Sequence, residues 1–230
     1  MIVRLKNTDA VFPPCHTAST DPDGLLAIGG KLTSKRLVAA YKNGIFPWFN
    51  DDHNQILWWC PSERAVMTPG KMKVSKSLRK TLNSKKFKIK ADQNFSKIIR
   101  LCATNTNRKL SSDTWITNNM IEAYSKLHAQ GIAHSIEVYE DNELVGGLYG
   151  VAIGGFFCGE SMFYQSPDAS KVAFYYLQEY LRKHEYDLID CQIMNPHLQS
   201  LGAFNISRDN FLKQINISSM KSLNQNKWEI

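Results

Sequence analysis

Proline, glycine and aromatic residues are frequent in the first 60 positions, where hydrophobic and polar residues show little regular alternation. FPPCHTASTDPDGLLAIGG (12–30) has the composition of a segment that is mostly loop and turn. KLTSKRLVAAYKNG (31–44) predicts one helix, with Thr33 or Ser34 as its N-cap and Gly44 past its end. IFPWFNDDHNQILWWCP (45–61) follows and carries three of the five tryptophans.

The middle of the chain has helical periodicity, interrupted by one extended pattern. A helix is expected to start near Ser75 and to run through SKSLRKTLNS, and FKIKA (87–91) predicts a strand with outward lysines. NFSKIIRLCATN (94–105) and TNNMIEAYSKLHAQG (117–131) predict two further helices, the second closed by Gly131. We therefore expect three helices and one strand between residues 75 and 131.

From residue 133 the pattern changes to strands. AHSIEVYE (133–140), LVGGLYGVAI (144–153) and FFCGESMFY (156–164), joined by DN and GG turns, predict an antiparallel meander. A helix follows, with Ser166 as its N-cap and Pro167 as its first residue. A strand (187–193), a short helix at PHLQSLGA and a last strand and helix through NISRDNFLKQI complete an α+β order. We place a domain boundary near 60–65, between a small N-terminal α/β domain (1–62) and a larger domain (63–230).

Two polar residues interrupt the apolar strand predicted at 187–193. Side chains alternate along a strand, so Asp190 and Gln192 are expected on one face, and Cys191 on the other face is expected to be a buried structural thiol. Glu160 interrupts the strand FFCGESMF in the same way. These two strands flank one helix, so the three polar residues either converge on one pocket or each cap a local backbone group. A convergent acidic pocket would bind a cation or an amine.

Positive charge is concentrated in one segment. The net charge is +7, and nine basic residues without an acid lie between Ala65 and Ala91, which leaves the rest of the chain at −2. Such a block is either a solvated face or a binding site for a polyanion, above all nucleic acid. A membrane surface is less favoured, because KSLRKTLNSKKF has few large apolar residues to insert.

Several common chemistries lack their motifs in this chain. The sequence has no G-x-x-x-x-G-K-[ST], no G-x-G-x-x-G after a strand, no G-x-S-x-G and no H-E-x-x-H, and its six histidines are scattered. We therefore expect no cofactor and no metal. The five cysteines form no C-x-x-C pair and the N-terminus is charged, which favours a cytoplasmic protein with reduced thiols. No heptad or long apolar surface helix is present, and we expect a monomer.

Nine blocks occur in one order along nearly the whole chain: DGLLAIGGKLTSKRLVAAYKNGIFPWF, ILWWCPSERAV, KVSKSLRKTL, DTWI, AHSIEV, LVGGLYGVAIGGFFCGESMF, DASK, LIDCQ and SLGA. Together they resemble one family, the leucyl/phenylalanyl-tRNA–protein transferases. Lys31, Cys60 and Tyr139 depart from the family's usual Asp, Ser and Trp. The resemblance implies a small N-terminal domain beside a larger domain with the acyl-CoA N-acyltransferase (N-acetyltransferase-like) fold and a mostly antiparallel mixed sheet.

The resemblance also implies an activity. Such an enzyme moves leucine or phenylalanine, and methionine less well, from leucyl-tRNA or phenylalanyl-tRNA to proteins with an N-terminal Arg or Lys. The product is marked for degradation by the N-end rule. The aminoacyl ester of the tRNA is already activated, so the enzyme's main task is to hold the acceptor's α-amine and the ester carbon in attack geometry. By resemblance, Gln192 and Asp190 are the catalytic positions. We picture the Gln192 oxygen accepting a hydrogen bond from the amine while Asp190 orients Gln192.

Further roles are assigned to residues by charge, by helical spacing and by the resemblance. Glu160 and Asp190 are expected to bind the cationic acceptor. The pocket for the aminoacyl side chain is expected at Met162, Phe174, Leu177 and Leu181, although core packing explains Leu181 as well. Trp48 and Trp115 are candidates for the terminal adenosine of tRNA. The candidates for tRNA phosphates are Lys73, Lys76, Arg79, Lys80, Lys85 and Lys86.

Two alternatives remain open from the sequence. One is an enzyme of the same fold that uses another donor, such as acyl-CoA or a different aminoacyl-tRNA. The other is an RNA-binding module without catalysis, in which the basic segment binds RNA and Asp190 is structural. Donor preference tests the first alternative. Replacement of Gln192 and Asp190 tests the second, because an RNA-binding module keeps its RNA affinity and has no turnover to lose.

Overall fold

The N-terminal part of the chain forms a small four-stranded sheet. The computed structural model describes residues 2–104, 115–223 and 227–230. The strands are β1 (Val3–Leu5), β2 (Leu25–Gly29), β3 (Phe46–Pro47) and β4 (Leu57–Trp59), in the order β1-β2-β4-β3. The prediction that residues 12–30 are mostly loop missed β2, because LLAIG pairs with both β1 and β4. Tertiary pairing thus makes a strand of a segment whose neighbours are turn residues.

One helix belongs to this small sheet, and the sequence predicted it correctly. Helix α1 (Ser34–Lys42) begins after Thr33, whose side chain accepts a hydrogen bond from the backbone N–H of Arg36 (3.2 Å). Gly44 follows the helix with φ +70°, a left-handed conformation that glycine adopts without strain.

A seven-stranded sheet forms the larger part, in the order β11-β5-β10-β9-β8-β7-β6. The predicted meander is β7 (Ala133–Glu140), β8 (Glu143–Ile153) and β9 (Phe156–Tyr164), and it is confirmed as antiparallel. Strands β5 (Glu63–Met67), β6 (Lys88–Ala91), β10 (Leu188–Asp190) and β11 (Phe204–Ser207) complete the sheet. Within the described residues, β9 and β10 are its one parallel pair. The predicted mostly antiparallel mixed sheet is therefore confirmed.

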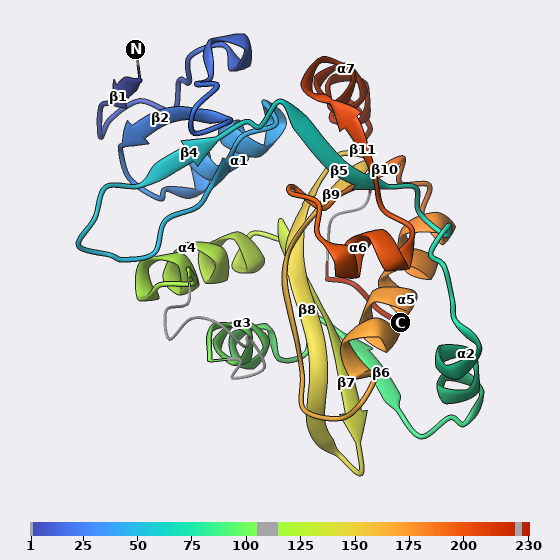
Figure 1. The fold of residues 1–230 in the computed structure, drawn as a ribbon. Helices are drawn as coiled ribbons and strands as arrows, with labels where there is room; N and C mark the ends of the chain where they lie inside the picture. Colours follow the sequence, from blue (N-terminus) through green and yellow to red (C-terminus); the bar gives the residue numbers. More distant parts are fainter. Residues whose placement is uncertain (1, 105–114, 224–226) are drawn as a thin grey trace.

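Helices cover both faces of the large sheet (Figure 1). Helices α3 (Phe95–Ala103) and α4 (Asn118–Ala129) pack on one face, and α5 (Ala169–Lys183) packs on the other. Short helices α6 (Pro196–Leu201) and α7 (Arg208–Ser218) flank β11 in the sequence. Helix α5 starts later than predicted, since Asp168 (φ +65°), not Ser166, is its N-cap. The Ser166 hydroxyl instead donates to Glu140 (2.7 Å).

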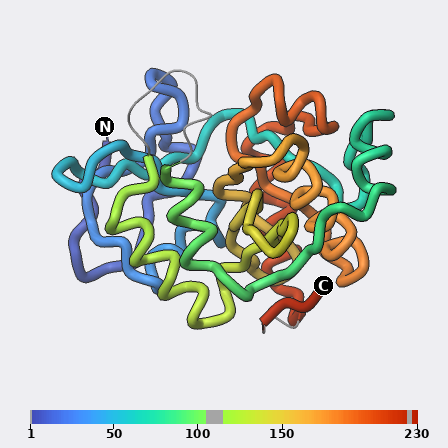
Figure 2. The backbone as a smooth tube through the Cα atoms, turned by 90° about the horizontal axis from the view of Figure 1, so that it is seen from below, coloured from blue at the N-terminus to red at the C-terminus, as the bar shows by residue number. Residues whose placement is uncertain are grey.

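The basic helix α2 (Lys76–Asn83) lies at the opposite end of the molecule from the small sheet, in both backbone views (Figures 1 and 2). Ser75 caps it as predicted, accepting from the N–H of Leu78 (3.1 Å). Leu78 is buried and the helix's basic side chains are exposed. The helix is thus anchored in the core through Leu78 and presents a charged outer surface.

One hydrophobic cluster links the two sheets. Trp58 and Phe46 of the small sheet belong to the same buried cluster as Tyr124 of α4, Tyr149 of β8 and Phe211 of α7. The strands before residue 60 form one sheet and those from residue 63 the other. Division into independent domains stays a prediction, because the shared core packs the two parts together.

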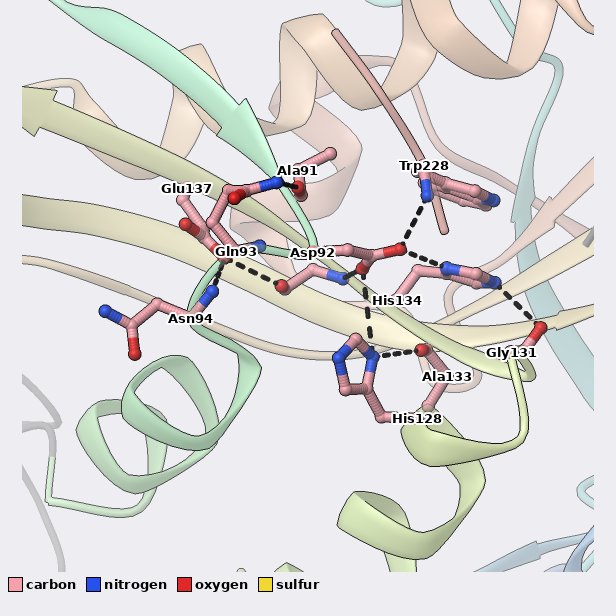
Figure 3. A network of polar contacts seen from close by, with 11 residues as sticks. Ala91, Asp92, Gln93, Asn94, His128, Gly131, Ala133, His134, Glu137 and Trp228 are labelled. Carbon is pink, nitrogen blue, oxygen red and sulfur yellow. Dashed lines mark hydrogen bonds and ion pairs between the residues drawn. The ribbon is translucent and has the colours of Figure 1, made fainter. Parts of the chain in front are cut away.

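A polar network buried beside β6 and β7 holds the C-terminal segment (Figure 3). The Asp92 carboxylate accepts hydrogen bonds from the backbone N–H groups of Ser135 (2.9 Å) and Trp228 (2.8 Å), and from His134 Nδ1 (2.7 Å). The second ring nitrogen of His134 contacts the Gly131 carbonyl oxygen (3.1 Å), and its ring stacks on Trp228 at 4.2 Å. These donors lower the pKa of Asp92 although burial alone would raise it.

Candidate active site

A pocket of about 1060 Å³ opens where strands β9 and β10 separate. The two strands pair only as far as Cys158 and Asp190. Beyond these residues β9 continues along β8, while the chain after β10 stays on β5 through bonds between Cys191 N–H and Ala65 O (2.9 Å) and between Ala65 N–H and Gln192 O (3.0 Å). Both diverging segments, 159–162 and 191–195, line the pocket.

Asp190 forms a buried ion pair with Arg64 at the base of this separation. Arg64 Nε and Nη2 each donate to one carboxylate oxygen at 2.8 Å, and both side chains are 1% exposed. The Arg64 guanidinium lies 4.6 Å from the ring centres of Phe46 and Phe211. Such a bidentate pair, enclosed by aromatic rings, fixes the carboxylate rigidly.

The predicted alternation of faces fails after Asp190. Strand β10 ends there, and Gln192 has φ +57°, a left-handed conformation that is uncommon for residues other than glycine. The Asp190 carboxylate supports this turn by accepting from the backbone N–H of Gln192 (2.9 Å). Asp190 therefore orients Gln192 through its main chain, and the two side chains do not share a strand face.

Glu160 lines the pocket, and three described donors surround its carboxylate. Its Oε1 accepts from Tyr41 (2.8 Å) of α1 and from Gln192 Nε2 (3.1 Å), and its Oε2 accepts from Tyr124 (3.0 Å) of α4. The two tyrosine hydroxyls also contact each other. Burial raises the pKa of Glu160 to about 7, and the two phenols partly oppose this rise. Glu160 and Gln192 thus converge on one pocket, which is one of the two alternatives that the sequence left open.

Asp190 does not line the pocket, so its predicted role in binding the acceptor gains no support from this geometry and stays a prediction. Both of its oxygens are occupied by Arg64, its charge is paired, and it is absent from the pocket lining. The prediction treated Asp190 as free because nothing in its local sequence revealed the arginine. The carboxylate that remains available to a cationic acceptor is Glu160.

The predicted apolar residues reach the pocket with one exception. Met162 of β9 and Phe174 and Leu177 of α5 line it. Leu181, one turn further along α5, is fully buried in the core and outside the lining, which supports the packing explanation for that residue. Helix α5 therefore lines the pocket with side chains between Ser170 and Leu177, and Leu181 lies beyond the lining.

Both predicted tryptophans line the same pocket. Trp48 follows β3, is 41% exposed and packs against Trp59 with ring centres 5.8 Å apart. Trp115 comes from the segment that precedes α4. Two indoles separated by 67 positions in the chain thus meet at one cavity, where a flat ring can stack on them.

The predicted phosphate-binding residues lie elsewhere, on an exposed surface around α2. None of them lines the pocket, and one of them, Lys86, pairs with Glu140 (3.1 Å). The structure thus places the basic surface apart from the pocket. The exposed residues are Lys73, Lys76, Arg79, Lys80, Lys85 and Lys86.

Three residues that position the carboxylates of the site, Arg64, Tyr41 and Tyr124, were not predicted from the sequence. Arg64 interrupts an apolar strand in SERAVM just as Asp190 interrupts its own, and the two charges could have been matched on that ground. Tyr41 and Tyr124 lie on regular amphipathic helices and carry no local signal. Lys171, paired with Asp168 (2.9 Å), and His197 also line the pocket and were not singled out.

Two absences hold for the described residues. No cluster of three His, Cys, Asp or Glu side chains there is arranged to hold a metal ion. None of the helices described is both long and apolar enough to cross a membrane.

Comparisons with known proteins give the family. The family model "Leucyl/phenylalanyl-tRNA protein transferase" matches residues 66–216, and the model of that family's N-terminal domain matches residues 30–62. Curated relatives named leucyl/phenylalanyl-tRNA–protein transferase include one from Idiomarina loihiensis, 48% identical over 100% of this chain and 96% of its own length. Another, from Psychromonas ingrahamii, is 47% identical over 99% of this chain and 94% of its own length.

Among solved structures, FemX shares the fold. It is 9% identical, covers 79% of this chain and 71% of its own, and has a TM-score of 0.50. The predicted N-acetyltransferase-like fold of the larger part is confirmed by this likeness. The family model covers more than half of the chain and the relatives match it almost end to end, so the chain belongs to the leucyl/phenylalanyl-tRNA–protein transferase family.

Proposed function

We propose that this chain, an aminoacyltransferase by its family, transfers leucine or phenylalanine, and methionine less well, from its tRNA to an acceptor protein. The acceptor begins with Arg or Lys, and the product is marked for degradation by the N-end rule. The protein acts as a monomer in the cytoplasm, where charged tRNA is made. The observation that carries the proposal is one pocket that combines Gln192 and Glu160 with an apolar wall and two tryptophans.

The reaction is the attack of an α-amine on the ester carbon of aminoacyl-tRNA. An α-amine has a pKa of about 7.7–8.0, so part of it is already neutral near pH 7. Gln192 Nε2 donates to Glu160, which leaves the amide oxygen as the acceptor for a hydrogen bond from the incoming amine. The fixed turn at Gln192, held by Asp190 and Arg64, supports this positioning role.

The apolar wall suits the donor's side chain. Met162, Phe174 and Leu177 line a space for an aliphatic or aromatic side chain that has no branch at Cβ. A β-branched side chain such as that of valine or isoleucine has its bulk close to the backbone, and we expect it to fit less well. Trp48 and Trp115 would stack on the terminal adenosine, since unpaired bases commonly bind aromatic faces.

The remaining parts of the substrates are assigned by charge. The available carboxylate, Glu160, favours an acceptor whose N-terminus carries extra positive charge, as Arg and Lys provide. The basic surface of α2 would bind tRNA phosphates without reading sequence, so any tRNA with the right amino acid serves. Binding should then weaken as salt rises.

The test is transfer of radiolabelled leucine from leucyl-tRNA to two peptides that differ at residue one, Arg against Ala, without added ATP or metal. Incorporation into the Arg peptide only is the expected result. Isoleucyl-tRNA and acetyl-CoA serve as alternative donors. The variant Gln192→Ala should lose at least about 100-fold in kcat, and Gln199→Ala, an exposed glutamine outside the pocket, should keep wild-type activity. A folded protein that binds tRNA but transfers nothing would be an RNA-binding module instead.

A further inference from the structure

The mechanism needs a proton acceptor that the Gln192 amide does not provide. Amine attack produces a positively charged nitrogen that must lose a proton before the ester bond breaks, and an amide is a very poor base. Among the described residues, the pocket is lined by two carboxylates, Glu160 and Asp168. Asp168 is paired with Lys171 at 2.9 Å and also accepts from Thr81 at 3.2 Å. Glu160 lies beside Gln192, 3.1 Å from its Nε2.

We propose that Glu160 is the catalytic proton acceptor of the transfer reaction, and that Tyr41 and Tyr124 are positioning residues that hold its carboxylate toward the reacting amine. This role rests on the proposed function, since it concerns the same pocket and the same reaction. It adds a step in the chemistry to the charge attraction that the proposed function assigns to the same carboxylate.

The proton moves in a closed cycle. The amine nitrogen forms a bond to the ester carbon, whose carbonyl electron pair moves onto oxygen. The Glu160 carboxylate then takes one proton from the positively charged nitrogen and becomes a carboxylic acid. When the carbonyl re-forms, the bond to the tRNA ribose oxygen breaks, and that oxygen leaves with the proton from Glu160. The products are a peptide bond and a free ribose hydroxyl, and Glu160 is a carboxylate again.

The surroundings of Glu160 suit this cycle. Among the described residues, the groups around it are Tyr41 of α1, Tyr124 of α4, Gln192, the buried Cys158 thiol of β9 and the buried Arg64–Asp190 pair. Its three described donors, two phenols and an amide, are uncharged, so the carboxylate is held in place without being locked in the ionised form. With its pKa raised to about 7, it can both accept and release a proton near neutral pH.

The two tyrosines make the role testable without removing Glu160. Each hydroxyl stabilises the ionised carboxylate, so replacing either with phenylalanine should raise the pKa of Glu160 further. Tyr186 provides a matched control, because its buried hydroxyl has no hydrogen-bond partner among the described residues and lies outside the pocket. Glu143, exposed at the start of β8, is a control for the change from Glu to Gln.

The experiment is the pH dependence of kcat and KM for leucine transfer to the Arg peptide, and to hydroxylamine, whose nitrogen is already neutral at pH 7. Wild type should lose activity on the acid side with both acceptors, because Glu160 becomes protonated in both cases. Tyr41→Phe and Tyr124→Phe should each move this acid limb up by about 0.5–1 pH unit, while Tyr186→Phe leaves it in place. Glu160→Gln should lose about 100-fold or more in kcat with both acceptors, including hydroxylamine, which has no cationic side chain for Glu160 to attract.

The other outcomes are distinct. A Glu160→Gln variant that keeps kcat and only raises KM for the Arg peptide would overturn the proton-acceptor role and return Glu160 to acceptor binding. An acid limb that stays fixed in both tyrosine variants, or that is absent with hydroxylamine, would overturn it as well. If wild type transfers leucine to no acceptor, the proposed function itself fails and this role fails with it. Glu143→Gln should match wild type throughout.

Discussion

The carboxylates of Asp92 and Glu160 lie in two buried polar networks of the same sheet, and their surroundings differ. Asp92 accepts from two backbone N–H groups and from His134, and its pKa is lowered. Glu160 accepts from two phenols and one amide, borders a pocket of about 1060 Å³, and its pKa is raised to about 7. Both carboxylates have partners, and of the two Glu160 is the one with access to a ligand.

The comparison teaches that the kind of donor decides what a buried carboxylate can do. Backbone N–H groups and an imidazole ring stabilise the ionised form of Asp92 enough to offset its burial. The neutral donors around Glu160 offset burial only in part. Asp92 therefore behaves as a structural anchor, whereas Glu160 keeps a proton equilibrium within reach of neutral pH. The buried Arg64–Asp190 pair resembles the Asp92 network, because Asp190 does not line the pocket and anchors neighbouring chain segments, although it adjoins the active site.

The largest effect is expected for Asp190→Asn, which tests whether a structural pair can also be essential. The change leaves a buried arginine without its counter-charge and should lower the free energy of unfolding by about 3–5 kcal/mol. Weaker support for the turn at Gln192 should also reduce kcat/KM of the folded fraction by about 100-fold or more. Denaturant unfolding and leucine transfer measure the two effects.

The double variant Arg64→Met with Asp190→Leu sharpens the same question. Replacing both charges with apolar side chains should recover much of the stability that Asp190→Asn removes, because no unpaired charge remains. Activity should stay low, because a leucine side chain cannot accept a hydrogen bond from the Gln192 N–H. Recovery of activity together with stability would mean that Asp190 serves the fold alone.

Trp228→Ala tests the other network. The indole is 1% exposed and stacks on His134 and Tyr180, so its removal should lower the free energy of unfolding by about 3–5 kcal/mol. At a temperature where the variant remains folded, kcat/KM for leucine transfer should equal that of wild type, since the network does not line the pocket. A selective loss of kcat would link the C-terminal segment to the active site.

The pH dependence of stability should have opposite signs for the two carboxylates. The pKa of Glu160 rises on folding from 4.5 to about 7, so its contribution to stability is lost as pH rises through this range. Glu160→Gln should therefore exceed wild type in stability by about 1–2 kcal/mol above pH 7, with the gain vanishing below pH 4.5.

Asp92→Asn provides the contrast. The pKa of Asp92 falls below 3.8 on folding, so the native carboxylate stabilises above that value and this contribution is lost in acid. The variant should be less stable than wild type at pH 7 and approach it as pH falls below about 4. Urea unfolding at several pH values between acid and mild base measures both slopes, and equal slopes for the two variants would contradict the distinction drawn between the networks.

The smallest effect on stability is expected on α2. Replacing Lys76, Arg79 and Lys80 with alanine should change the free energy of unfolding by less than about 0.5 kcal/mol per residue, because all three are exposed. The KM for leucyl-tRNA should rise, and the slope of log affinity against log salt should fall by roughly 0.7–0.9 for each phosphate interaction that the substitutions remove. If the triple variant binds leucyl-tRNA with the same salt dependence as wild type, the basic surface of α2 is a solvated face and does not bind tRNA phosphates.

The sequence by itself determined the order of elements from residue 75 onward, two helix N-caps and the family. The meander at 133–164 and the caps Thr33 and Ser75 follow from local rules, because strand alternation and capping involve residues only a few positions apart. The strand β2 and the start of α5 escaped these rules, since pairing with distant strands and the left-handed Asp168 decided them.

Only the tertiary structure decided what the polar residues do. The sequence marked Asp190, Gln192 and Glu160 as unusual within apolar strands, yet it did not separate the paired carboxylate from the available one. Asp190 is neutralised by an arginine 126 positions away, and Glu160 is held by Tyr41, 119 positions away. The pKa of a buried carboxylate and its access to a ligand depend on such neighbours. Folding, rather than local spacing, brings these neighbours together.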